Sequence, residues 1–150
     1  MAFTGLGSKL AISAARGTYD DNATTGFPSL TYTKIDDLLS SGTVLGGTWG
    51  STSDTIMETG EQVTSKTSKS ATEFTVSHFS DVSNAGTDLL DAAFESRNYY
   101  SFKLTNGAGD ELYFEAHVTG RNENGGDTES HERIEYTIMP RSLGAVKVAA

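Results

Sequence analysis

The sequence predicts a mainly β protein in which two antiparallel sheets pack together as a sandwich or partial barrel, flanked by one α-helix. Three observations predict this fold class. Several short runs alternate apolar and polar residues with period two, turn signals rich in Asn and Gly separate these runs, and one segment has the apolar spacing of a helix. The length of 150 residues suits a single domain with one core.

The N-terminal part of the chain predicts two strands joined by a loop. Residues 1–8 are small and predict an arm, and Lys9–Ala14 predicts the first strand. Residues 16–29 gather Asp, Asn, Gly and Pro, which is typical of a loop. Leu30–Leu39 predicts the second strand.

Residues 42–70 form a long polar segment that consists mostly of Thr, Ser and Gly. Thr and Val favour strands, but no apolar face here is broad enough to form a core of its own. A compact domain rarely holds a structureless connection of this length. The segment is therefore either a mobile loop or a long β-hairpin that needs a neighbouring subunit to be stable.

One helix is predicted near Asn84–Ser96, where Ser83 or Asn84 caps the first amides. A narrow apolar stripe runs along it and predicts that one face packs on a sheet. The stripe consists of Leu89, Leu90, Ala93 and Phe94.

Strands are predicted on both sides of this helix. Ala71–Phe79 precedes it, and Tyr99–Thr105 follows it and leads through an Asn-Gly turn into Glu111–Thr119. Residues 121–127 predict a loop before the last long strand at Thr128–Met139.

The chain is acidic, with 20 Asp and Glu against 11 Lys and Arg and a net charge of −9. It shows no basic patch of the kind that grips phosphates, and an acidic surface suits a protein past which DNA moves without sticking. No cysteine is present, which excludes disulfides and thiolate metal sites. No apolar run approaches the ~20 residues of a membrane span and no signal peptide is evident, so we expect a soluble protein made in a cytoplasm.

No catalytic constellation is apparent, and we expect no enzyme, no metal and no cofactor. The three histidines, His78, His117 and His131, lack metal-binding spacing and are expected to be ordinary surface or rim residues. Glu111 and Glu115 share one face of a predicted strand, where we expect a solvated acidic surface. No Gly-x-Ser-x-Gly elbow or phosphate loop occurs.

The order of these elements over residues 30–142 resembles the major tail tube proteins of long-tailed, non-contractile bacteriophages. The resemblance is carried by the Thr/Ser/Gly-rich segment and by Lys34-Ile35-Asp36-Asp37-Leu38, Thr72–Phe79, the helix Gly86–Glu95, Tyr100–Gly107 with its Asn-Gly turn, Glu111–Thr119 with Gly120, and Ile134–Pro140.

The resemblance implies a structural virion protein whose hexameric rings stack into the hollow tail tube that conducts DNA from capsid to host. Residues 1–150 would be a single tail-tube domain with an arm at 1–8, an inter-subunit hairpin or loop at 42–70 and a C-terminal tail at 141–150. The implied partners are further copies, a tape-measure protein and tail-tip or terminator proteins, with DNA passing transiently, no specific DNA binding and no membrane. The implied location is the virion tail, after synthesis in the host bacterial cytoplasm.

Three groups of residues receive hypothetical roles on this basis. The candidate lumen or ring-contact acids are Asp36, Asp37, Asp54, Glu58 and Glu61. The candidates for burial between subunits are Trp49, Ile56 and Met57, and the candidates for pairing between rings are Lys66 and Lys69.

Three alternatives remain open. An inner-tube subunit of a contractile tail or of a type VI secretion-like apparatus would have the same fold and would also assemble into stacked rings. A monomeric ligand-binding β-sandwich would require a clustered aromatic platform, whereas the tyrosines of this chain are scattered. A small enzyme would require a nucleophile or metal constellation.

Overall fold

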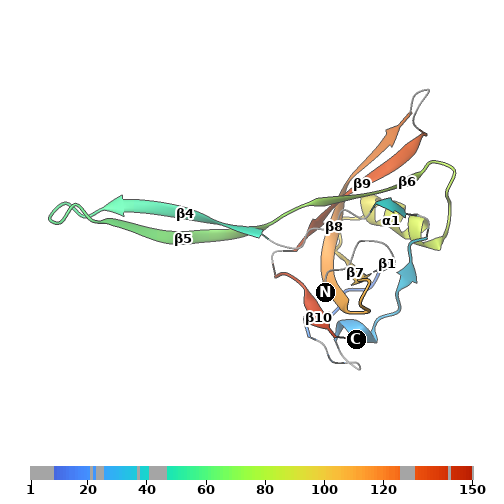
Figure 1. The fold of residues 1–150 in the computed structure, drawn as a ribbon, viewed down its shortest axis with the longest axis horizontal. Coiled ribbons are helices and arrows are strands. Elements are labelled where there is room, and N and C mark those ends of the chain that lie inside the picture. The colour runs from blue at the N-terminus through green and yellow to red at the C-terminus, as the bar shows by residue number, and fades with distance from the viewer. Residues whose placement is uncertain are drawn as a thin grey trace.

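The computed structural model describes residues 9–20, 22, 26–36, 38–40, 47–125, 131–141 and 143–149. The chain forms a mainly β body that holds one α-helix, and a long two-stranded hairpin projects from this body (Figure 1). In chain order the elements are β1 (Lys9–Ser13), the 3-10 helix η1 (Phe27–Ser29), β2 (Thr33–Lys34), β3 (Leu38–Ser40), β4 (Gly47–Thr55), β5 (Gln62–Ala71), β6 (Phe74–Phe79), α1 (Ala85–Glu95), β7 (Tyr100–Thr105), β8 (Glu111–Asn124), β9 (Arg133–Pro140) and β10 (Val146–Val148).

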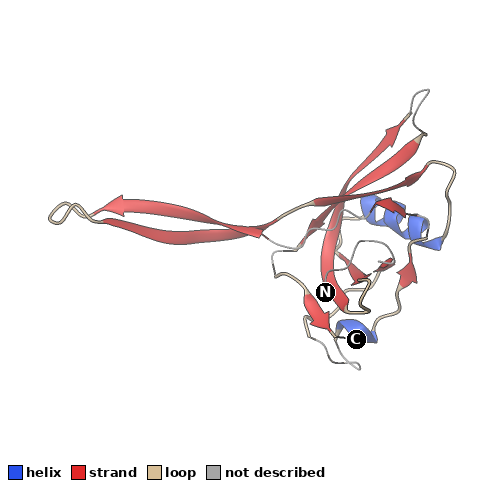
Figure 2. Ribbon diagram, viewed as in Figure 1, coloured by secondary structure: helices blue, strands red, loops and turns tan. Residues whose placement is uncertain are grey.

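The strands form two antiparallel sheets (Figure 2). The larger sheet has the order β2-β1-β7-β8-β9-β6-β3, and β10 pairs with the beginning of β8. The smaller sheet consists of β4 and β5 alone and is the projecting hairpin. The predicted fold class, mainly β with two antiparallel sheets and one flanking helix, is confirmed, but the smaller sheet projects from the body instead of packing on the larger one (Figure 1). The larger sheet is not a closed barrel, because β2 and β3 are its two ends.

The hydrophobic core lies between α1 and one face of the larger sheet. Phe102 and Phe114 stack from neighbouring strands β7 and β8, with ring centroids 5.5 Å apart. Leu90 of α1 and Tyr136 of β9 are fully buried in the same cluster. Burying a side chain of this size contributes about 1.5–3 kcal/mol, so each of these residues stabilises the body substantially.

Helix α1 follows the prediction closely. Asn84 is the N-cap: its side chain accepts a hydrogen bond from the Thr87 N–H at 3.1 Å, and the Asn84 N–H donates to the Thr87 hydroxyl at 2.9 Å. This reciprocal capping box satisfies amides that the helix itself leaves unpaired. Gly86 in the first turn lies close to Lys34 and Ile35, where a Cβ atom would approach backbone atoms within 2.6 Å.

The predicted strand Leu30–Leu39 is wrong as one continuous element. Its residues form β2 and β3, which lie at opposite ends of the sheet order. Ile35 between them is 3% exposed and belongs to the core. Four Cα–Cα steps from Lys34 to Leu38 span at most roughly 14 Å. The sheet therefore curls until its two ends lie within this distance.

The predicted loop at 121–127 is also wrong in its first part, because β8 continues to Asn124 and pairs there with β9. The register shifts between Val118 and Gly120, and a Cβ atom on Gly120 would lie 3.1 Å from the Thr137 hydroxyl oxygen. A bulge at a glycine lets two strands change register and continue. The strand predicted at Thr128–Met139 is β9, which begins only at Arg133, and residues 126–130 lie outside the described residues.

Candidate functional site

The projecting hairpin is the first candidate site. Of the two alternatives for residues 42–70, the structure shows the long hairpin over 47–71, while 42–46 lie outside the described residues. Every residue from Thr48 to Ser70 is exposed, and the hairpin extends away from the body (Figure 1). An isolated two-stranded hairpin is marginally stable in water at best. The described part of the chain supplies no surface that covers this hairpin.

Hydroxyl groups and a tight turn maintain the hairpin. The Ser53 and Thr64 hydroxyls hydrogen-bond across the strands at 3.1 Å. At the turn, the Ile56 N–H donates to the Glu61 carbonyl at 2.8 Å. Gly60 has a φ of 68°, which glycine adopts without a steric cost. Backbone pairing and small polar contacts, rather than apolar packing, therefore define its shape.

The hairpin has two distinct faces because its register shifts once. Trp49 pairs with Lys69 and Ser51 pairs with Lys66, so two steps along β4 match three steps along β5. Directly opposed residues of antiparallel strands lie on the same face. Lys66 and Lys69 therefore share one face with Trp49, and the Lys66 ammonium lies 5.3 Å from the centre of the indole ring. We call this the Trp49 face, consisting of Trp49, Ser51, Lys66 and Lys69.

The opposite face of the hairpin carries a negative charge, that of Asp54. Asp54 pairs with Val63 and Thr52 pairs with Ser65. We call this the Asp54 face, consisting of Thr52, Asp54, Val63 and Ser65. Thr67 lies on the same side as Gly50, because a Cβ atom on Gly50 would approach the Thr67 hydroxyl oxygen within 2.4 Å. Gly50 thus gives the extra residue of the bulge its space.

The structure brings most of the predicted site residues onto this hairpin. Trp49, Ile56 and Met57, the candidates for burial between subunits, are 51%, 41% and 98% exposed. Asp54, Glu58 and Glu61 are exposed in the outer half of the hairpin. Asp36 lies apart from them on the body, where it forms an ion pair with Lys34 at 3.2 Å. Asp37 lies outside the described residues.

A second polar centre, which the sequence did not indicate, surrounds Glu115 on β8. Glu115 is 1% exposed, and its carboxylate accepts hydrogen bonds from Arg16 at 3.1 Å and from Arg141 at 3.0 Å. The expected solvated acidic surface at Glu111 and Glu115 is therefore wrong for Glu115. The segment after β1 covers this face of the sheet, with Phe27 fully buried. Phe27 stacks on Tyr113 of β8.

Aromatic rings complete this centre. The Arg141 guanidinium lies 5.6 Å from the Tyr19 ring centre and 5.5 Å from the Tyr99 ring centre, and the Tyr99 ring stacks on His117 at 3.8 Å. The hydrogen bond to Glu115 raises the pKa of Arg16 above its ordinary value. These contacts attach the segment after β1 and the residue after β9 to the same strand. Their arrangement is that of a structural clamp.

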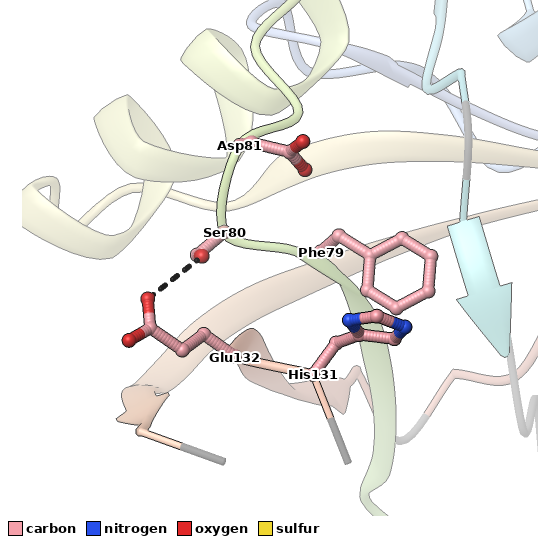
Figure 3. Close-up of a pocket in the computed structure, with 5 residues that line it drawn as sticks. All are labelled: Phe79, Ser80, Asp81, His131 and Glu132. Carbon is pink, nitrogen blue, oxygen red and sulfur yellow. Dashed lines mark hydrogen bonds between the residues drawn. The ribbon is translucent and has the colours of Figure 1, made fainter. Parts of the chain in front are cut away.

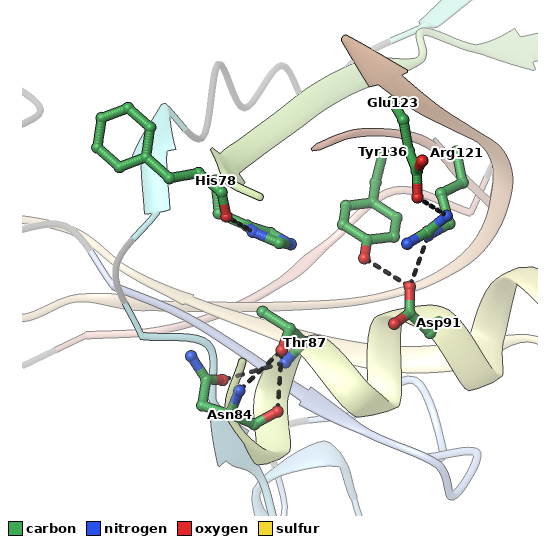
Figure 4. A network of polar contacts seen from close by, with 8 residues as sticks. His78, Asn84, Thr87, Asp91, Arg121, Glu123 and Tyr136 are labelled. Atoms are coloured by element: carbon green, nitrogen blue, oxygen red, sulfur yellow. Dashed lines mark hydrogen bonds and ion pairs between the residues drawn. The ribbon is translucent and has the colours of Figure 1, made fainter. Parts of the chain in front are cut away.

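A third network connects α1 to the sheet (Figure 4). One Asp91 carboxylate oxygen accepts hydrogen bonds from Arg121 at 2.8 Å and from the Tyr136 hydroxyl at 2.6 Å. Arg121 also donates to Glu123 at 3.0 Å. Burial raises the pKa of Tyr136 to about 12. The network holds the helix against β8 and β9.

His78 corrects the expectation that all three histidines lie at the surface. It is 1% exposed on β6, with its Nδ1 atom 2.7 Å from the Phe79 carbonyl oxygen (Figure 4). Its Nε2 atom is buried and has no hydrogen-bond partner among the described residues. The imidazole lies 5.7 Å from the Tyr136 ring and fills part of the core.

One surface pocket lies where β6 ends and β9 approaches (Figure 3). Its lining residues are Phe79, Ser80, Asp81, His131 and Glu132. The Ser80 hydroxyl donates to Glu132 at 3.4 Å, and His131 packs edge-on against the Phe79 ring. Ser80 therefore contacts a carboxylate rather than the histidine, and the group lacks the nucleophile–base contact of a hydrolase.

The described residues show neither a metal-ligand cluster nor a membrane-spanning helix. No group of three or more His, Cys, Asp or Glu side chains is arranged to hold a metal ion there. Within those same ranges, no helix is long and apolar enough to cross a membrane.

Three solved structures share the fold of this chain. No protein-family model and no curated protein sequence matches the chain. The SPP1 tail tube structure matches with a TM-score of 0.61 and 14% identity, over 99% of this chain and 80% of that chain. The baseplate of the anti-feeding prophage matches with a TM-score of 0.61 and 7% identity, over 99% and 98% of the two chains. The tube-terminating cap of the same prophage matches with a TM-score of 0.50 and 14% identity, over 100% and 94%. The chain therefore has the tail-tube fold.

Proposed function

We propose that this chain is a structural subunit of the tail tube of a long-tailed, non-contractile bacteriophage. In this proposal hexameric rings stack into a hollow conduit that carries DNA from the capsid to the host. The observation that carries the proposal is a tail-tube fold whose long hairpin is exposed on both faces in the single chain. Such a hairpin needs a neighbouring surface, and stacked copies provide one.

The hairpin is the inter-subunit element in this proposal. Trp49, Ile56 and Met57 are half to fully exposed in one chain and become buried when a second copy covers them. Fully burying a large apolar side chain contributes about 1.5–3 kcal/mol. Three such residues on each subunit, repeated around a ring, supply a substantial driving force for assembly.

The acidic residues serve the passage of DNA. The net charge of −9 repels phosphates, and repulsion lets DNA slide without specific binding. We assign the lumen or ring contacts to Asp36, Asp37, Asp54, Glu58 and Glu61, as the resemblance to tail tube proteins implies. Lys66 and Lys69 pair with acids of the adjacent ring. No catalytic role, cofactor or metal forms part of the proposal.

The partners follow from the same role. They are further copies of this chain, a tape-measure protein inside the growing tube, and tail-tip and terminator proteins at its ends. The subunit is made in the host cytoplasm and resides in the virion tail. The equal TM-score to the anti-feeding prophage baseplate supports a second candidate, an inner-tube subunit of a contractile tail or secretion-like apparatus.

Electron microscopy of the concentrated protein, with light scattering alongside, tests the proposal. Hollow tubes or six-fold rings are the expected result, with or without added tail-tip protein as nucleator. A compact monomer near 15.9 kDa under both conditions contradicts the proposal. Adding candidate sheath protein separates the two candidates, because only an inner tube of a contractile system acquires a regular outer layer.

A further inference from the structure

The β-bulge gives the projecting hairpin one basic and one acidic face. In a regular strand, residues three positions apart point to opposite faces, which would separate Lys66 from Lys69. The extra residue in β5 removes this separation, because Trp49 pairs with Lys69 while Ser51 pairs with Lys66. The place of Thr67 beside Gly50 agrees with this register.

The two faces complement each other in chemistry. The Trp49 face combines two ammonium groups with an indole that is 51% exposed. The Asp54 face places a carboxylate directly beside Val63, which is 46% exposed. Both lysines of the hairpin lie on the Trp49 face, and the remaining positions of the Asp54 face are hydroxyl residues. A cation and an aromatic ring on one side thus correspond to an acid and an aliphatic side chain on the other.

We propose that the hairpins of neighbouring copies stack with the Trp49 face of one copy against the Asp54 face of the next. This inference rests on the proposed function and specifies which surfaces meet in the assembly. Lys66 meets Asp54, and the Trp49 ring covers Thr52 and Ser65, next to Val63 on the same face. Within one hairpin Lys66 is level with Ser51, and Asp54 lies three residues further along β4. Placing Lys66 of one copy opposite Asp54 of the next therefore offsets the two hairpins by roughly 10 Å along their length.

The geometry of this contact suits a ring or a helical stack. Each copy uses two different faces, so the interface is heterologous and continues from copy to copy instead of ending at a dimer. Stacked sheets lie about 10 Å apart, which excludes water from the facing side chains. Opposite charges then select the correct face, because two Trp49 faces or two Asp54 faces would bring like charges together.

A composition-matched variant tests the assignment of faces. The double substitution S65K/K66S moves one lysine to the Asp54 face, because Ser65 pairs with Thr52 there, and leaves the net charge unchanged. We expect its critical concentration for assembly to rise by about tenfold, since the moved charge loses its acid. The thermal unfolding of the body should not change. Assembly at the wild-type concentration overturns the inference while leaving the proposed function intact.

Exchanging the charges of Asp54 and Lys66 tests whether a double variant restores the assembly that each single variant loses. D54K and K66D each place like charges on the facing surfaces and should weaken assembly. The double variant D54K/K66D restores opposite charges at this contact, so it should assemble better than either single variant. A double variant that assembles as poorly as the sum of the two single effects contradicts the pairing of Lys66 with Asp54.

Cross-linking tests which hairpin faces meet, even in a sample that forms no tubes. The chain has no cysteine, so S51C marks the Trp49 face and T52C marks the Asp54 face as the sole thiols. With a bifunctional thiol reagent of about 10 Å reach, a mixture of the two variants should cross-link several-fold more than either variant alone. Equal yields in all three samples overturn the inference. If the wild-type chain forms no tubes, the proposed function fails, and this assay at high concentration still accepts or rejects the stacking.

Discussion

Glu115 and Arg141 are joined twice, through their side chains and through their backbones. The Arg141 guanidinium contacts the Glu115 carboxylate at 3.0 Å, and the Arg141 N–H donates to the Glu115 carbonyl oxygen at 2.8 Å. Arg16 reaches the same carboxylate from the segment after β1. One buried acid of β8 thus holds two segments that are distant in the sequence.

Replacing Glu115 by Gln should destabilise the body by about 1–3 kcal/mol, because two arginines lose the charge that they share. Arg16 and Arg141 are themselves partly exposed to water, which reduces the loss of stability. Urea unfolding followed by circular dichroism measures the effect. The matched control is Glu123→Gln, whose side chain is 69% exposed and should change stability by less than about 0.5 kcal/mol. Equal effects of the two substitutions would refute the role of the clamp.

Gly86→Ala should destabilise the protein by about 1–3 kcal/mol. The new Cβ atom would lie 2.6 Å from both the Ile35 Cα atom and the Lys34 carbonyl oxygen, so the helix must move away from β2. Gly125→Ala is the control, because no atom of the described residues lies within 4 Å of its Cβ position. Thermal unfolding of both variants checks the prediction, and a more stable Gly86→Ala variant would contradict it, since alanine favours helices.

Alkaline pH should destabilise the fold through Tyr136. Burial raises its pKa to about 12, whereas an unfolded tyrosine releases its proton near pH 10. Between these values the unfolded state binds fewer protons, so the free energy of unfolding falls as pH rises. The contribution is complete below pH 10 and is lost as the pH approaches 12.

Tyr136→Phe isolates this contribution. At pH 7 the variant should lose about 1–2 kcal/mol, because the hydrogen bond to Asp91 is removed. Between pH 10 and 12 its unfolding free energy should fall less steeply than that of the wild type. Urea titrations at several pH values measure both slopes, and parallel slopes would show that Tyr136 does not cause the alkaline loss.

Trp49 is the only tryptophan of the chain and reports on the hairpin directly. Because its side chain is half exposed in one subunit, we expect emission typical of a solvated indole and quenching by iodide. Assembly should shift the emission to shorter wavelength and reduce the quenching. Trp49→Ala should raise the critical concentration about tenfold or more, as the burial of a large side chain predicts. Emission that stays unchanged in assembled tubes would place Trp49 outside the interface.

Local pattern was sufficient for the elements whose partners are near in sequence. The apolar stripe and the capping residues of Asn84–Ser96 predicted α1 nearly to its ends. Alternation and an Asn-Gly turn predicted the β7–β8 pair, since a turn and period-two faces determine such a pairing. The polar composition of 42–70 already pointed to a segment that lacks a core of its own.

The tertiary structure alone decided the burial of Glu115, the separation of β2 from β3 and the charge of each hairpin face. Glu115 is buried because Arg16 and Arg141 approach it from distant segments, and alternation along one strand says nothing about what covers its far side. Lys66 and Lys69 share the Trp49 face because β5 has one extra residue, after which its side chains point to the opposite faces of the hairpin. Register and coverage are non-local, because they depend on which segments meet in space and therefore on the whole fold.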